Sequence, residues 1–291
     1  MTAPLVEIAV DGGAGLGFGH ISRSRVLAAA LCEAGARVRF DPRSDLAREA
    51  LAALPDEAGA ADVLVLDLPY ADDAAIEAAR AAGRPVVALD HGGEAVADLA
   101  IRTDPREIPM AARRCCYGPA YAMIRPEILQ QTARDDGHVL VCVGGSDLGD
   151  LGVAAARRLA EAGARVILVR GPLAGPLATP PPGVEIRNTP PDLPALMAGC
   201  RFAVTNGGTT ALECMALGKA VHVLAQTDAE HATAERFLSD GIILGLGLDS
   251  LESPDPGRMQ AIAAAGGAQV DGRGAERMAR LVMELWEKKP E

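Results

Sequence analysis

The stretch Gly207-Gly208-Thr209-Thr210-Ala211-Leu212-Glu213 joins two different patterns in the sequence. The apolar run Phe202 to Val204 precedes it, and a helical run from Ala211 to Leu217 follows it. This order predicts a strand, a glycine turn and the N-terminus of a helix. Such a junction offers unpaired backbone N–H groups and the positive end of a helix dipole, both of which suit a phosphate group.

The residue types in this stretch fit a phosphate site but also fit a plainer role. Gly207 and Gly208 would let a ligand approach the backbone without a Cβ in the way. Glu213 lies a little over one turn into the helix, where its carboxylate can accept from sugar hydroxyls. In the plainer interpretation Thr209 caps the helix and Glu213 lies on a solvated face. For GGTT in isolation the plainer interpretation is the stronger one, so the rest of the chain must decide.

Length and composition set the broad class of the protein. The chain has 291 residues, enough for two domains of ordinary size. It is 49% hydrophobic and only 3% aromatic, which predicts a core of Ala, Val, Leu and Ile. The net charge of −11 argues against a general nucleic-acid or anionic-membrane surface, since both need basic patches. A local arginine cluster for phosphate remains compatible with it.

Cysteine use and the absence of long apolar runs indicate a cytoplasmic protein. The six cysteines form no CxxC pair, and most lie in apolar runs. They are typical of reduced core cysteines, not of a disulfide framework or a zinc site. The N-terminus lacks the basic and apolar regions of a signal peptide, and no apolar run reaches the ~18 residues of a membrane span. We expect a monomer.

The first part of the chain alternates strands with helices. We expect strands over 5–10, 37–40, 62–67 and 85–89, with helices over 21–34, 46–53 and 74–82. This alternation predicts βαβ units and a parallel sheet, at whose carboxyl edge ligands gather. Asp67 and Asp90-His91 stand at that edge. Residues 102–136 have no clear period, and 125–137 serve as the linker.

The alternation then restarts and predicts a second sheet. We expect strands over 138–143, 165–170, 184–187, 202–204 and 220–224, with helices over 151–162, 193–198, 231–238 and 276–287. Residues 253–274 are predicted to be loop with at most one helix. The expected fold is α/β, with two Rossmann-like parallel-sheet domains and a cleft between them. The domains span 1–130 and 137–270, and the helix over 275–291 packs back on the first.

The first glycine-rich loop, residues 11–19, delivers His20 to the start of a helix. A dinucleotide fingerprint fits poorly, because Phe18 stands where its third glycine belongs and Asp41 is the only acidic ribose ligand on offer. A neutral His20 at this place can accept a proton, although it is also suited to capping the helix. For Asp67 and Asp90 a structural and a catalytic role are equally open. The histidines lack the spacing of a metal site.

A second glycine loop, Gly144-Gly145-Ser146-Asp147, opens the second domain at a strand-to-helix turn. It can flank one diphosphate together with Gly207 and Gly208. Two such loops in one domain are a stronger signal than either alone.

Four segments carry a resemblance to a known family and together span almost the whole chain: Gly17-Phe18-Gly19-His20 with Arg23, residues 117–127 (YGPAYAMIRPE), residues 143–147 (VGGSD), and residues 206–213 (NGGTTALE) with Leu217-Gly218. They resemble the GT-B nucleotide-sugar enzymes. Within these, the chain is most similar to the UDP-2,4-diacetamido-2,4,6-trideoxy-β-L-altropyranose hydrolases of pseudaminic acid biosynthesis. The glycine motifs are shared with glycosyltransferases, whereas the GPAYAMIRPE segment is more specific to the hydrolases.

The resemblance implies a division of labour. The C-terminal domain would hold UDP through Gly144, Gly145, Ser146, Asp147, Gly207, Gly208, Thr209 and Thr210 at the diphosphate, Glu213 at the ribose, Asn188 near the uracil, and Glu230. The N-terminal domain would hold the sugar through Asp11, Gly17, Gly19, Arg23, Asp90, Tyr121 and Arg125. His20 would take a proton from the attacking water, with Asp67 orienting it. The implied reaction is cofactor-free and metal-independent hydrolysis at the anomeric carbon, with inversion and release of UDP.

One departure from the family pattern concerns the nucleotide site. The family often has Asn-Gln in the loop after the penultimate strand, where this chain has Asp228-Ala229-Glu230-His231. A carboxylate near a diphosphate is unfavourable unless it turns away. Two alternatives to the UDP-sugar hydrolase therefore stay open: a GT-B glycosyltransferase with a UDP-sugar donor, and a non-catalytic nucleotide-sugar-binding protein.

Overall fold

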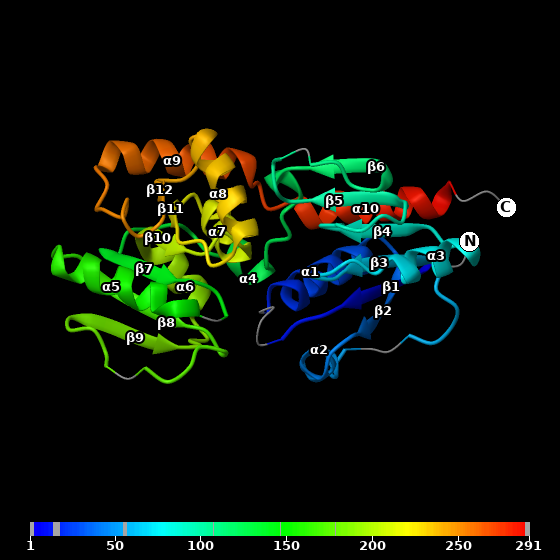
Figure 1. Ribbon diagram of the computed structural model, residues 1–291, viewed down its shortest axis with the longest axis horizontal. Coiled ribbons are helices and arrows are strands. Elements are labelled where there is room, and N and C mark those ends of the chain that lie inside the picture. Colours follow the sequence, from blue (N-terminus) through cyan, green and yellow to red (C-terminus); the bar gives the residue numbers. More distant parts are fainter. Residues whose placement is uncertain are drawn as a thin grey trace. The chain divides into compact units, whose positions relative to one another are not determined.

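The alternating strands and helices build two separate parallel sheets in the computed structural model of the chain (Figure 1). The structure describes residues 3–13, 18–54, 57–106, 108–145, 147–177 and 179–288. The chain divides into two units. Unit 1 comprises Met1–Met123 and Arg273–Glu291, and unit 2 comprises Ile124–Gly272.

Unit 1 is built on a six-stranded parallel sheet. Its strands are β1 (Leu5–Val10), β2 (Arg37–Pro42), β3 (Val63–Asp67), β4 (Val86–Leu89), β5 (Ala97–Arg102) and β6 (Ala112–Tyr117). Their order is β2-β1-β3-β4-β5-β6, so the chain runs outward from β1 to β2 and then resumes on the other side of β1. This reversal between β1 and β3 is the topological switch point, where open α/β sheets bind ligands.

The helices of unit 1 bury both faces of this sheet. They are α1 (Gly19–Glu33), α2 (Asp45–Leu51), α3 (Asp73–Ala81), the 3₁₀ turn η1 (Pro119–Tyr121) and α10 (Gly274–Glu287). Along β3, Val63 and Val65 pack in one core with α1 and α10, while Leu64 and Leu66 pack in another with α3. Strands that are buried on both faces explain the continuous apolar runs in the sequence.

Helix α10 completes unit 1 from the far end of the chain. Met278, Ala279 and Val282 of this helix share the core of α1 and the sheet. Figure 1 shows α10, in red, beside the blue α1. Arg277 donates to the carbonyl of Ala120 over 2.9 Å, which ties the helix to η1.

Unit 2 repeats the plan with its own parallel sheet. Its strands are β7 (His138–Cys142), β8 (Arg165–Arg170), β9 (Val184–Asn188), β10 (Cys200–Thr205), β11 (Ala220–Val223) and β12 (Gly245–Leu246). Their order is β12-β11-β10-β7-β8-β9. The chain moves outward from β7 to β9 and then returns to the other side of β7, so the switch point lies between β7 and β10.

Helices again cover both faces of the second sheet. They are α4 (Pro126–Leu129), the 3₁₀ turn η2 (Leu148–Asp150), α5 (Leu151–Glu161), α6 (Leu193–Gly199), α7 (Thr209–Ala216), α8 (Asp228–Ser239) and α9 (Pro256–Gln269). Val139 and Val141 share a core with α5, while the intervening Leu140 is equally buried. The expected double-sheet α/β fold is confirmed.

Some elements escape the sequence pattern. Strand β6 and helix α4 lie inside residues 102–136, for which the pattern predicts no element, and β5 was not predicted. Strand β6 is an edge strand whose side chains are mostly half-buried or exposed, so it lacks an apolar run. Helix α9 is a full helix of fourteen residues, although the pattern of 253–274 suggested mostly loop.

Candidate functional site

At the switch point of unit 1, a histidine and a carboxylate form a hydrogen-bonded dyad. His20 is the second residue of α1, the helix that follows β1, and Asp67 is the last residue of β3. The register pairs Val10 with Asp67, so the two strands deliver their ends to one edge. The His20 Nδ1 lies 2.7 Å from Asp67 Oδ1. The topology therefore brings together two residues that are 47 positions apart.

Asp67 is fully buried but surrounded by donors. Arg23 donates to it through Nε at 2.9 and 3.1 Å, and Ser24 Oγ donates over 2.7 Å. Burial by itself raises the pKa of this carboxyl, but the charge of Arg23 and the bond from His20 outweigh burial and hold the pKa well below its usual range. Asp67 is therefore an acceptor-only carboxylate at neutral pH.

The ionised Asp67 fixes the tautomer of His20. Arg23 Nη2 also lies 3.2 Å from the Nδ1 of His20, and two donors cannot share a hydrogen bond. Because Asp67 only accepts, Nδ1 carries the hydrogen and donates it to Asp67. The Nε2 of His20 is then left with its lone pair on a ring that is 19% exposed. This is the arrangement by which a carboxylate orients a histidine general base.

The other predicted sugar residues of unit 1 lie at different distances from this dyad. Asp90 is joined to it by Arg23, whose Nη1 donates to Asp90 Oδ2 over 2.8 Å. Asp11 follows β1 and accepts from Tyr70 over 3.0 Å. Burial raises the Asp11 pKa, but its hydrogen bonds lower it overall. Gly19 begins α1.

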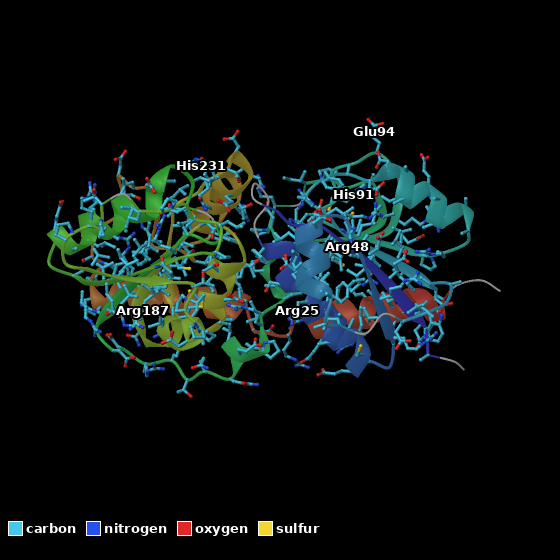
Figure 2. All side chains as sticks on the ribbon, turned by 90° about the horizontal axis from the view of Figure 1, so that it is seen from below. Arg25, Arg48, His91, Glu94, Arg187 and His231 are labelled. Carbon is cyan, nitrogen blue, oxygen red and sulfur yellow. The ribbon has the colours of Figure 1, made fainter. Side chains whose placement is uncertain are left out.

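Of the other predicted sugar residues in this part of the chain, one lies outside the described residues and one packs in the core. Gly17 lies outside the described residues. Tyr121 packs half-buried against the core around α10. His91, labelled in Figure 2, is buried and bonds to the Ala95 carbonyl through Nε2.

In unit 2 the two glycine loops leave neighbouring strands at the switch point. Gly144, Gly145 and Asp147 follow β7, and Gly207 and Gly208 follow β10. Cys142 pairs with Thr205, so the loops leave the sheet side by side. Ser146 lies outside the described residues. The sheet thus brings the two loops together, as their placement after strands predicts.

The backbone amides at the N-terminus of α7 have no side-chain cap. Gly208 is the N-cap residue, and no side chain caps the helix, so Thr209 does not play the capping role that the plainer interpretation gives it. Thr209 and Thr210 form the first turn of α7. Their backbone amides lie at the positive end of the helix dipole, which favours an anion.

Glu230 lies beside this helix terminus and holds the loop that leads into it. Its Oε1 accepts from Asn206 Nδ2 over 2.6 Å, and its Oε2 accepts from the amide of Gln226 over 2.7 Å. A Cβ on Gly207 would meet the Glu230 carbonyl at 3.1 Å, and one on Gly208 would meet Asn206 Nδ2 at 3.1 Å. Packing alone therefore favours glycine at both positions, with or without a ligand.

Glu213, the predicted ribose ligand, pairs with Arg125. Arg125 Nε donates to Glu213 Oε1 over 2.6 Å, and Nη2 donates to Oε2 over 2.9 Å. The carboxylate is buried, and each oxygen keeps a further lone pair for a hydroxyl. Arg125, which the resemblance assigns to the sugar, thus meets a predicted nucleotide residue of unit 2.

Asn188 and the remaining strand histidines lie apart from the glycine loops. Asn188 ends the edge strand β9, with β8 between that strand and β7. His138 and His222 bond to the carbonyls of Leu196 and Gly247. Burial lowers the pKa of both imidazoles, which suits neutral structural histidines.

Sequence reasoning missed three residues that hold these sites. Ser24 lies one helical turn after His20, and that spacing is the signal that it shares Asp67. Asn206 and Gln226 come from separate strand ends. Gln226 donates to the Val143 carbonyl over 2.7 Å and accepts from the Leu148 amide over 2.7 Å. Such a bridge between two loops leaves no local signal in the sequence.

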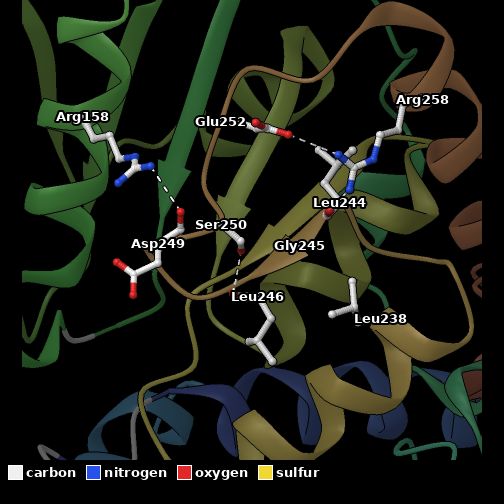
Figure 3. Close-up of a pocket in the computed structure, with 9 residues that line it drawn as sticks. All are labelled: Arg158, Leu238, Leu244, Gly245, Leu246, Asp249, Ser250, Glu252 and Arg258. Atoms are coloured by element: carbon white, nitrogen blue, oxygen red, sulfur yellow. Dashed lines mark hydrogen bonds and ion pairs between the residues drawn. The ribbon is translucent and has the colours of Figure 1, made fainter.

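A pocket beside β12 lies elsewhere in unit 2 (Figure 3). Its two cations are already satisfied by backbone: Arg158 donates to the Asp249 and Leu251 carbonyls, and Arg258 donates to the Leu244 carbonyl. Arg258 also reaches Glu252 at 3.5 Å. With its charges occupied, this pocket is a weaker anion site than the switch-point edge.

The described residues contain neither a metal-binding cluster nor a helix that could span a membrane. No group of three or more His, Cys, Asp and Glu side chains there is placed to hold a metal ion. No helix in the same part of the chain has the length and apolar character needed to cross a bilayer.

Comparisons with known proteins identify the fold. No family model and no curated protein matches the sequence. Among solved structures, MurG of Acinetobacter baumannii matches with a TM-score of 0.64 and 13% identity, over 97% of this chain and 99% of that one. The glycosyltransferase of kitacinnamycin matches with a TM-score of 0.64 and 17% identity, over 99% and 100%.

A third match is a Staphylococcus aureus protein solved with a nucleotide. The MnaA–UDP structure matches with a TM-score of 0.59 and 13% identity, over 99% of both chains. At these identities the likeness establishes the fold, and the fold is GT-B, as the sequence predicted.

Proposed function

We propose that the chain is an enzyme that breaks the glycosidic bond of a nucleotide sugar and transfers the sugar to a hydroxyl acceptor. Unit 2 binds the nucleoside diphosphate, and His20 of unit 1 is the general base. The observation that carries the proposal is the bond of 2.7 Å from His20 Nδ1 to the ionised Asp67. It leaves Nε2 free to take a proton from the attacking hydroxyl.

The same dyad stabilises the product of that proton transfer. When Nε2 accepts a proton, the ring becomes a cation that is hydrogen-bonded to Asp67. The buried carboxylate favours this cation, as in other histidine–carboxylate pairs. Asp67 itself stays ionised, because Arg23 and Ser24 continue to donate to it.

Unit 2 supplies what the leaving group needs. Charge builds on the diphosphate as the bond to the sugar breaks, and preorganised amides at a helix terminus stabilise such charge. The first turn of α7 has its amides at such a terminus, with no capping side chain. UDP is the expected nucleotide, which the MnaA structure in complex with UDP supports.

The identity of the acceptor separates two candidate reactions. Transfer to an acceptor is favoured by the fold shared with the kitacinnamycin glycosyltransferase. Hydrolysis, with water as the acceptor, is the second candidate and is favoured by the GPAYAMIRPE segment, whose Arg125 binds Glu213. Both reactions use the same base and release the same nucleotide.

Release of UDP distinguishes these candidates. Purified protein is incubated with UDP-linked sugars, including 2,4-diacetamido sugars, first alone and then with a panel of sugar and phenol acceptors. UDP release that depends on an acceptor supports transfer. Release of UDP and a reducing sugar in water alone supports hydrolysis. Binding of UDP without turnover under either condition would contradict both and leave a binding protein.

The role of His20 has its own test. We expect His20→Ala to lower kcat by about 10²–10⁴-fold, because the base is lost, while the Kd for UDP stays unchanged. Arg48→Ala is the control, since the Arg48 side chain is 62% exposed and lies on α2 of the same unit (Figure 2). Full turnover by the His20 variant would rule out this residue as the base.

A further inference from the structure

Arg170 is a buried arginine at the carboxyl edge of the second sheet. It is the last residue of β8 and is only 7% exposed. Val141 of β7 pairs with Leu168, so Arg170 and Val143 each stand two residues beyond this pair. Val143 leads directly into the loop of Gly144 and Gly145. The guanidinium therefore belongs to the edge where that glycine loop leaves the sheet.

Among the described residues, no counter-ion pairs with Arg170, and one nitrogen of its guanidinium lacks a partner. Its Nε is buried and has no hydrogen-bond partner, and no carboxylate of the described residues forms an ion pair with it. Burying an unpaired guanidinium is costly, because water no longer solvates it. Arg23 of unit 1, whose side chain is 13% exposed, shows the ordinary solution, since it is paired with Asp67 and Asp90.

Other unsatisfied groups lie at the same edge. Among described residues, the buried side-chain atoms of unit 2 without a partner are Arg170 Nε, Asp147 Oδ2 and Asn206 Oδ1. They come from the ends of three adjacent strands, β8, β7 and β10. One needs an acceptor and two need donors. A nucleotide offers both, through its phosphoryl oxygens and its ribose hydroxyls.

Asp147 is the charged neighbour that a structural explanation would invoke. Its Oδ1 accepts from the Gly152 amide over 2.9 Å at the start of α5. Burial raises the pKa of Asp147, and the charge of Arg170 acts in the opposite direction. The two side chains nevertheless form no ion pair. Asp147 thus binds an amide in the first turn of α5, and the Nε of Arg170 stays without a partner.

We propose that Arg170 binds a phosphoryl group of the nucleotide at the carboxyl edge of β7, β8 and β10. The guanidinium provides a fork of donors that matches phosphate oxygens, and the bond is charge-assisted. The identity of the ligand as a nucleotide rests on the proposed function. That the ligand is an anion follows from the buried charge of Arg170 alone. Arg170 is absent from every sequence motif described above.

The test compares three probes on purified full-length protein: inorganic pyrophosphate, UDP and uridine. Calorimetry gives the Kd, and thermal unfolding gives the Tm with and without each probe. Arg170→Met is expected to weaken pyrophosphate and UDP by about tenfold to a hundredfold, the range of a lost charge-assisted bond, and to leave uridine unchanged. Arg165→Met is the matched control, because Arg165 lies at the other end of β8 with its side chain 61% exposed.

Stability without ligand provides a second readout. Because Met fills the space without a buried charge, Arg170→Met should have a Tm at or above that of the wild type. A structural ion pair predicts the reverse: a lower Tm for Arg170→Met, the same loss for Asp147→Asn, and no further loss in the double variant. That pattern, or unchanged pyrophosphate binding by the variant, would overturn the proposal.

The probes also separate this proposal from the proposed function. If the wild-type protein binds pyrophosphate through Arg170 but does not bind UDP, the anion site is supported. The proposal that its ligand is a nucleotide is then contradicted. Wild-type protein that binds no pyrophosphate contradicts the anion site. If Arg170→Met does not fold, Arg170→Lys replaces it; a single ammonium loses the fork, so weaker pyrophosphate binding supports the proposal and unchanged binding overturns it.

Discussion

Among the single residues of unit 1, Asp67 is the one whose surroundings constrain it most. It is fully buried at the end of β3 and accepts from His20, Arg23 and Ser24. A buried carboxylate is tolerated when its oxygens are fully hydrogen-bonded and its charge is paired. The same contacts that make Asp67 stable also set the tautomer of His20. Structure and proposed chemistry therefore depend on one side chain.

The substitution Asp67→Asn removes the charge of this side chain and nearly keeps its shape. It therefore tests how much the charge contributes to stability. The largely covered Arg23 then keeps only Asp90 as a counter-ion, so we expect unfolding free energy to fall by about 3–5 kcal/mol. Urea unfolding at pH 7 measures this loss. Asp45→Asn is the control, because the Asp45 side chain is exposed, and it should leave stability nearly unchanged. Equal stability of wild type and Asp67→Asn would contradict the burial argument.

The pH dependence of stability follows from the same carboxyl. Burial raises its pKa, but Arg23 and His20 lower it below the value of about 3.9 for an unfolded chain. A lowered folded-state pKa means that ionisation stabilises the fold above pH 4 and that this contribution is lost as the pH falls further. The stability gap between wild type and Asp67→Asn should therefore be constant from pH 7 to 5 and narrow below pH 4. If the stability gap between wild type and Asp67→Asn widened toward low pH, it would contradict a lowered pKa for Asp67.

At the scale of elements, the exit of β8 supports the first glycine loop of unit 2. The Leu173 amide donates to the Gly145 carbonyl over 2.9 Å. A Cβ on Gly171 would lie 2.5 Å from the carbonyl oxygens of both Gly144 and Gly145. The two backbones are in contact, with no room for a side chain between them. The position of the glycine loop is therefore set by its neighbour strand as well as by its own sequence.

Gly171→Ala tests this contact. The added methyl must push backbone aside, so we expect a loss of about 1–3 kcal/mol in unfolding free energy and a raised Kd for UDP. Gly175→Ala is the matched control four residues on, since a Cβ there meets nothing within 4 Å and should leave both quantities unchanged. Denaturant unfolding and calorimetry measure the pair. Identical behaviour of the two variants would contradict the packing argument.

At the scale of the whole molecule, unit 1 is discontinuous in sequence. The chain leaves it after Met123, builds unit 2, and returns at Arg273 to add α10. Met278 of α10 is 1% exposed within the core of unit 1. Unit 2 has its own core around α5 and its sheet. Each unit therefore has its own core as a source of stability, although the chain passes from unit 1 to unit 2 and back.

Matched core substitutions should show this separation. Met278→Ala in unit 1 and Met197→Ala in unit 2 each delete a buried methionine, with an expected cost of about 2–5 kcal/mol. Hydrogen exchange should report lost protection in β1–β6, α1 and α10 for the first variant, and in β7–β11 for the second. If either substitution lowered protection equally in both units, the two units would form one cooperative structure.

Local pattern in the sequence was sufficient for the class of fold and for most strands and helices. Runs such as Val63 to Asp67 are apolar on both faces, so they predict buried parallel strands without knowledge of neighbours. Glycines after strands marked the turns at both switch points. Strand β6 was not predicted, because its two arginines are exposed on a sheet edge, where a strand needs no apolar pattern.

Apolar runs and glycine turns thus predicted the two-sheet α/β architecture, the glycine loops, and His20 and Asp67 as candidates. Which of these groups meet depends on the fold. It joined His20 to Asp67 and Arg125 to Glu213, turned Glu230 toward Asn206, and left the Nε of Arg170 buried without a partner. The physical reason is that propensity and periodicity act over a few residues. A hydrogen bond or an unpaired charge depends instead on strand order, which brings together residues far apart in the chain.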